Sequence, residues 1–92
     1  MSMSHDERSV RVKNLCLTVE SMFDRGVIDG SKAIHLGMRV GMLYSYPDAI
    51  GFLTAEENLR IHFRELMGIH EEREEGDRRM KEMERNLVAK AR

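Results

Sequence analysis

The last 39 residues, 54–92, read TAEENLRIHFRELMGIHEEREEGDRRMKEMERNLVAKAR and contain no proline. This stretch predicts one long helix, because helix-forming and charged residues dominate it. A helix of this length extends for about 58 Å, whereas a compact domain of this chain's size is only about 25 Å across. Part of the helix must therefore project from the domain and meet solvent or another chain.

The first part of this helix is amphipathic, and its middle is not. Four apolar residues recur at three- and four-residue steps and are expected to face inward: Leu59, Phe63, Leu66 and Ile69. Residues 71–79 carry no apolar side chain, and oppositely charged i,i+4 pairs there contribute only about 0.2–0.5 kcal/mol each. Gly68 and Gly76 oppose helix continuity by about 1 kcal/mol each, with a bend or break near Gly76 as the alternative to a continuous helix.

A first helix is predicted over residues 5–25. Ser4 and Glu7 have the S-x-x-E spacing of a capping box, in which the serine oxygen accepts a hydrogen bond from a free backbone N–H group of the first turn. Gly26 stands where a left-handed residue would end the helix.

A second helix is predicted over residues 32–45, with Ser31 as its N-cap. It should end before Pro47, because the residue ahead of a proline is pushed out of the helical region. Thr54 and Glu57 form another capping-box spacing and place the start of the long helix at residue 54.

These elements predict an all-α protein with one domain overall. Residues 1–53 would form a core of two short-to-medium helices packed as a hairpin with a connecting loop, and residues 54–92 the long, charged C-terminal helix. Hydrophobic residues are 41% of the 92-residue chain, which suffices for only a small core. Because small domains are marginally stable alone, we expect assembly as an oligomer, with a dimer favoured.

The charge and cysteine content exclude several functions. Fifteen basic and sixteen acidic residues give a net charge of −1, which disfavours nucleic-acid binding and a polybasic membrane anchor. Cys16 is the only cysteine, so an internal disulfide is impossible. The chain shows neither the apolar run of a signal peptide nor a stretch able to span a bilayer, so a cytoplasmic location is expected.

A stripe of small residues runs along the second helix. Ala33, Gly37 and Gly41 are spaced four apart and share one face. Two glycines inside a helix cost about 2 kcal/mol together, so close approach of another helix should offset that cost. Packing within the chain is the favoured interpretation, and a subunit interface is the alternative.

A second candidate interface follows the long helix. Eight residues alternate by four and three, which is heptad spacing: His62, Leu66, Ile69, Arg73, Gly76, Met80, Met83 and Leu87. Only five of these eight are apolar, so a long regular coiled coil is not expected. An antiparallel or short pairing would let Met80, Met83 and Leu87 contact another copy, and the alternative is a solvated helix with an apolar tip.

The sequence gives no sign of catalysis or of a cofactor. No phosphate-binding, dinucleotide-binding or nucleophile-elbow motif is present. Cys16 lies in an apolar stretch, as an inert buried thiol would. The four histidines lack the further ligands that a metal site needs, so neither a metal nor an enzymatic activity is expected.

A helix-turn-helix DNA-binding protein and a protein that binds a small anionic ligand are the alternatives. Lys32, His35 and Arg39 would face outward on the second helix, and Tyr46 follows it. These four residues are the candidates for contact with nucleic acid or ligand. The leading hypothesis is a small non-enzymatic protein that self-associates and binds, inhibits or scaffolds another protein, whose identity the sequence does not indicate.

Overall fold

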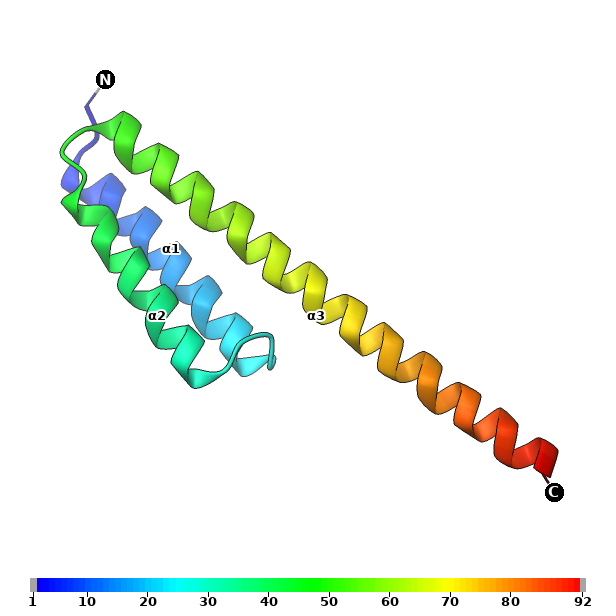
Figure 1. The fold of residues 1–92 in the computed structure, drawn as a ribbon. Coiled ribbons are helices and arrows are strands. Elements are labelled where there is room, and N and C mark those ends of the chain that lie inside the picture. The colour runs from blue at the N-terminus through cyan, green and yellow to red at the C-terminus, as the bar shows by residue number, and fades with distance from the viewer. Residues whose placement is uncertain (1, 92) are drawn as a thin grey trace.

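A computed structural model describes residues 2–91, which form three α-helices, one short 3-10 helix and no strand. The predicted all-α class is therefore confirmed. The elements are α1 (His5–Asp24), α2 (Gly30–Gly41), η1 (Met42–Ser45) and α3 (Ala49–Ala91). Figure 1 shows α1 and α2 as an antiparallel hairpin, with α3 running back along it in the direction of α1 and continuing beyond it.

Both ends of α1 are capped where predicted, the first of them by the serine half of the capping box. The Ser4 hydroxyl accepts a hydrogen bond from the Glu7 N–H group at 3.1 Å. Gly26 has a φ of 75°, the left-handed conformation that glycine adopts without steric cost. The Val27 N–H group then donates to the Met22 carbonyl at 2.8 Å, which is the long hydrogen bond of a Schellman motif. The turn into α2 is thus fixed by local sequence.

The prediction for the start of α2 was wrong. Asp29, not Ser31, is the N-cap, and its carboxylate accepts a hydrogen bond from the Lys32 N–H group at 2.8 Å. Both residue types cap helices well, but Asp29 comes first in the chain and leaves Ser31 inside the first turn. The α-helix also ends earlier than predicted, at Gly41, and the chain continues to Ser45 as the tighter helix η1.

The start of α3 also differs from the prediction, because the helix begins at Ala49 and Thr54 lies inside it. The Asp48 carboxylate accepts a hydrogen bond from the Gly51 N–H group at 2.8 Å, and the Asp48 carbonyl accepts one from Phe52 at 3.2 Å. A Cβ atom at Gly51 would lie 2.7 Å from the capping oxygen of Asp48. The glycine therefore allows this early start, and the capping-box spacing at Thr54 is not used.

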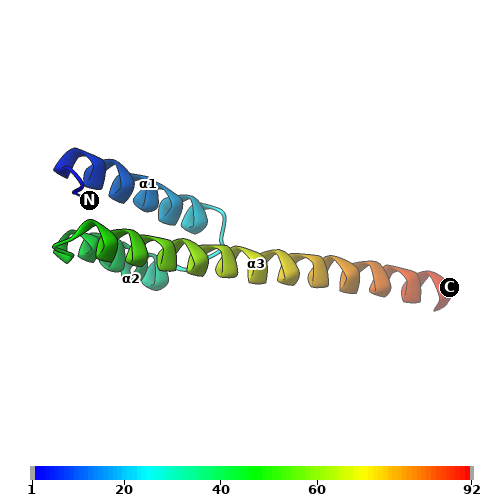
Figure 2. The same ribbon diagram turned by 90° about the horizontal axis from the view of Figure 1, so that it is seen from above.

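The continuity of α3 past Gly76 is confirmed. The helix comprises 43 residues, or about 64 Å, and the molecule measures 69 × 22 × 16 Å. Its radius of gyration is 19.2 Å, against about 12 Å for a compact domain of the same size. Figure 2 shows α3 continuing as a nearly straight rod beyond the ends of α1 and α2. Arg92, the predicted last residue of the helix, lies outside the described residues.

The hydrophobic core lies between the hairpin and the first part of α3. Its buried side chains come from every element and from the turn before α2: Val12, Leu15, Val19, Met22, Ile28, Leu36, Val40, Leu43, Phe52, Leu59 and Phe63. None of them comes later in the chain than Phe63. The first four turns of α3 therefore complete the core, whereas residues 71–91 are all exposed.

Candidate interaction site

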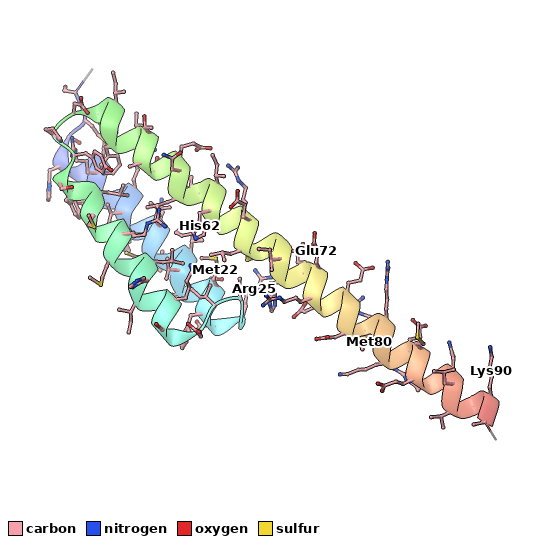
Figure 3. All side chains as sticks on the ribbon, in the orientation of Figure 1. Met22, Arg25, His62, Glu72, Met80 and Lys90 are labelled. Atoms are coloured by element: carbon pink, nitrogen blue, oxygen red, sulfur yellow. The ribbon has the colours of Figure 1, made fainter. Side chains whose placement is uncertain are left out.

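The projecting part of α3 carries an apolar stripe with no partner in the chain. Met80 and Met83 are each 63% exposed, and Leu87 is 61% exposed. Their three- and four-residue spacing places them on one face of the helix. Figure 3 shows Met80 far beyond the hairpin, on the way to Lys90 near the end of the helix. The predicted apolar tip of α3 is therefore accessible to another molecule.

The same stripe continues back along α3 to the side of the bundle. Leu66 is half-buried and packs against the core, whereas Ile69 is 48% exposed instead of facing inward as predicted. Phe63 is the last of the buried core residues along α3, so Ile69, six residues later, lies beyond the buried core. We call the eight heptad positions of α3 the α3 seam, defined as His62, Leu66, Ile69, Arg73, Gly76, Met80, Met83 and Leu87.

The small residues of α2 do not make the close contact expected inside the chain. A Cβ atom added at Gly37 or Gly41 would meet no heavy atom within 4 Å beyond its own helix. Gly41 is exposed, and Gly37 and Ala33 are half-buried. The favoured interpretation, tight packing within the chain, is therefore wrong at the two glycines, whereas Ala33 does pack against the core.

An exposed apolar ridge lies beside these glycines. It consists of three residues at i,i+4 spacing that are 64–67% exposed: Ile34, Met38 and Met42. Next to it, Ala33, Ile34 and Gly37 line a shallow groove of about 300 Å³ with Cys16 and Phe23 of α1. The α1–α2 hairpin thus presents a second apolar surface.

The basic residues of α2 were correctly expected to face outward. Lys32, His35 and Arg39 are all exposed. Tyr46 lies beyond η1, where its carbonyl oxygen accepts a hydrogen bond from the Arg8 guanidinium at 2.5 Å. This contact ties the loop after η1 to α1 and gives Tyr46 a structural role.

A groove between α1 and α3 was not anticipated. It encloses about 450 Å³, and the arginines Arg25, Arg60 and Arg64 stand beside the apolar side chains of Met22, Phe63 and Met67. Arg64 is paired with Glu57 at 3.1 Å, and Arg25 approaches the Met67 sulfur at 3.9 Å. Sequence spacing could reveal that Arg60 and Arg64 share a face of α3, but only the tertiary fold brings Arg25 beside them.

Glu56 is a buried charge that the sequence analysis also missed. It is 4% exposed, and the Arg11 guanidinium lies 2.6 Å from its Oε1 atom. Arg60 lies 3.6 Å from Oε2, which has no hydrogen-bond partner. Position 56 falls on the same face as Phe52, Leu59 and Phe63, so helical spacing alone could have indicated its burial.

The histidines of α3 pair with nearby carboxylates. His70 lies 3.0 Å from Glu74, and His62 lies 3.9 Å from Glu65. Within residues 2–91, no group of three or more histidine, cysteine or acidic side chains is placed to hold a metal ion. None of the helices described in this range combines the length and apolarity needed to cross a bilayer.

Comparisons with known protein families, with characterised proteins and with solved structures found no significant match.

Proposed function

We propose that this chain is a small, non-enzymatic interaction protein that self-associates, as a dimer, through the projecting half of α3. The observation that carries the proposal is the exposure of every residue from 71 to 91 while the helix stays unbroken. Most helical stability in proteins comes from packing of an apolar face rather than from intrinsic propensity, and this segment has no such packing within its own chain. Packing against another chain would supply that stability.

Local interactions offer this segment little support. The ion pair between Glu75 and Arg79, 3.0 Å apart, is exposed on both sides, and such i,i+4 pairs contribute about 0.3–0.5 kcal/mol. Gly76 costs about 1 kcal/mol relative to alanine within a helix. The apolar side chains of Met80, Met83 and Leu87 can offset this deficit once another molecule buries them.

A second protein could then bind the surface that dimerisation leaves free. The ridge of Ile34, Met38 and Met42 with the neighbouring glycines is apolar and exposed. Methionine side chains adapt to different partner shapes, which suits a binding, inhibiting or scaffolding role. None of the three ridge positions carries a charged side chain, so an apolar partner surface would fit there.

The test of self-association is the solution mass, measured by light scattering after size exclusion over a hundredfold concentration range. We expect a dimer for the natural chain and a monomer for the variant Met80→Glu with Met83→Glu. Val88→Glu is the control, since Val88, one residue after Leu87, is 57% exposed but stands outside the seam. A natural chain that stays monomeric throughout the range would refute the proposal.

One observation favours a second candidate, the binding of a small anionic ligand. Arg25, Arg60 and Arg64 gather along the groove between α1 and α3, and guanidinium groups suit carboxylate and phosphate ligands. A thermal-shift panel of nucleotides and other anions tests it, because a ligand that prefers the folded state raises the melting temperature. Any shift should disappear in Arg25→Ala, and the absence of a shift across the panel would dismiss this candidate.

The geometry of the hairpin offers no comparable support for DNA binding. The two helices of a helix-turn-helix cross at about 90–120°, whereas α1 and α2 run antiparallel (Figure 1).

A further inference from the structure

The α3 seam has a pattern that favours one orientation of pairing. In heptad notation its residues alternate between positions a and d. Position a is taken by Leu66, Arg73, Met80 and Leu87, and position d by His62, Ile69, Gly76 and Met83. The seam is exposed from Ile69, which is 48% exposed, to Leu87, and its two residues beside the bundle, His62 and Leu66, are partly exposed.

We propose that two copies pair through their α3 seams in antiparallel orientation, with the two-fold axis between Arg73 and Gly76. This inference rests on the proposed self-association and specifies its register. In an antiparallel pair, each a residue of one helix packs in a layer with a d residue of the other. The pairing would extend over residues 62–87, a length of about 38 Å.

This register matches apolar residues with apolar residues on both sides of the centre. Leu66 meets Met83 of the second copy, and Ile69 meets its Met80. The two-fold axis repeats both layers, so four of the central six layers are fully apolar. At each end, Leu87 packs against His62, whose side chain is only 30% exposed beside the bundle. The projecting half of each helix is thereby covered by the bundle half of the other.

The two central layers explain why an arginine and a glycine stand in the seam. In this register Arg73 of each copy lies opposite Gly76 of the other. Glycine has no side chain, and a Cβ atom there would meet nothing within 4 Å in the single chain. The arginine stem can therefore cross the opposite helix while its guanidinium reaches solvent, as long basic side chains do at apolar contacts.

Charges beside the seam agree with the same register. Glu72 and Arg79 both occupy position g, and in antiparallel pairs g residues face g residues. Glu72 of one copy would stand within about 3 Å along the axis of Arg79 of the other, and symmetry gives two such pairs. On the opposite flank, His70 would face Asp77 of the second copy in the same manner.

A parallel dimer would be disfavoured by the same residues. It would place the two Arg73 side chains together in one layer, and like charges repel. It would also bring Glu72 next to Asp77 of the partner, since g residues then face the following e residues. The antiparallel arrangement exchanges these two repulsive contacts for the arginine–glycine layers and the Glu72–Arg79 pairs.

Disulfide trapping tests the register directly. In a Cys16→Ser background, a tagged chain with Ile69→Cys is mixed with an untagged chain with Met80→Cys and equilibrated in a glutathione redox buffer. We expect the mixed disulfide between positions 69 and 80 to dominate. Two Ile69→Cys chains should cross-link poorly, because their cysteines would lie about 16 Å apart along the axis.

The results separate this inference from the proposed function. Dominant Ile69→Cys homodimers would overturn the antiparallel register while leaving self-association intact. A natural chain that light scattering shows to be monomeric would overturn both.

A charge exchange gives a second, independent measurement. Glu72→Arg should raise the dimer Kd by about threefold or more, since it sets Arg against Arg79 of the partner. Adding Arg79→Glu in the same chain should restore the natural Kd. A tighter dimer for Glu72→Arg alone would overturn the register, because a parallel pair would gain from placing Arg beside Asp77.

Discussion

The guanidinium of Arg11 lies 2.6 Å from the carboxylate of Glu56 and joins α1 to α3 at the edge of the core. The carboxylate side chain is 6% exposed and the arginine side chain 43% exposed. A buried carboxylate needs such a partner, because desolvation without compensation is costly. This pair therefore fixes how the first part of α3 sits against the hairpin.

Removing the arginine should destabilise the protein. We expect Arg11→Ala to lower the free energy of unfolding by about 1–3 kcal/mol, because Glu56 would be left with only the more distant Arg60. Urea denaturation monitored by circular dichroism measures the change. Arg64→Ala is the matched control: it breaks an ion pair exposed on both sides and should cost less than about 1 kcal/mol. Equal losses of unfolding free energy in the two variants would show that the Arg11–Glu56 pair contributes no more than an exposed ion pair.

Alanine substitutions at Asp29 and Ser31 distinguish the observed N-cap of α2 from the one that the sequence suggested. Asp29→Ala should cost about 1 kcal/mol, since the Lys32 N–H group would lose its acceptor. Ser31→Ala should leave stability unchanged or raise it slightly, because alanine is the better residue within a helix. Thermal unfolding of both variants tests the pair. A larger loss for the Ser31 variant would show that the helix begins later.

Glycines in two conformations should respond to alanine with opposite signs. Gly26→Ala forces a Cβ atom into the left-handed region and should cost about 1–2 kcal/mol. Gly41→Ala replaces a helical glycine where a Cβ meets no neighbour and should stabilise the monomer by about 0.5–1 kcal/mol. Urea midpoints at a fixed low protein concentration compare them. If Gly41→Ala destabilises the protein only at high protein concentration, this glycine contacts another chain.

A chain ending at Glu72 should retain the fold of the bundle. All the buried core residues precede that point, so we expect cooperative unfolding with a similar midpoint at low concentration. The shortened chain should be monomeric, and its melting temperature should not depend on concentration. Loss of cooperative unfolding would show that the projecting helix stabilises the bundle within its own chain.

The helical class and the long helix were predictable because both depend on local signals. Periodic apolar residues, the Ser4 cap and Gly26 act within a few residues of themselves, and proline is absent throughout α3. The helix starts were harder, because Asp29 and Ser31, or Asp48 and Thr54, are competing caps of similar strength. Local sequence does not decide between them, whereas the geometry of the connecting turns does.

The candidate surfaces also divide into those that local sequence predicts and those that depend on the tertiary fold. The exposure of Met80, Met83 and Leu87 followed from a helix too long for its core. The burial of Glu56 and the clustering of Arg25 with Arg60 depend on how α1 meets α3, over separations of about 35–45 residues. Gly37 and Gly41 were misinterpreted because small residues permit close packing without requiring it.

The elongated shape of the chain affects how its mass must be measured. A particle of 69 × 22 × 16 Å experiences more friction than a sphere of equal volume, so it diffuses slowly and leaves a gel-filtration column early. Even one copy would elute like a heavier globular protein, and an antiparallel pair would be bulky at both ends. Rotational diffusion is also anisotropic: nuclear spin relaxation should differ between amide groups aligned with the α3 axis and those in the turns.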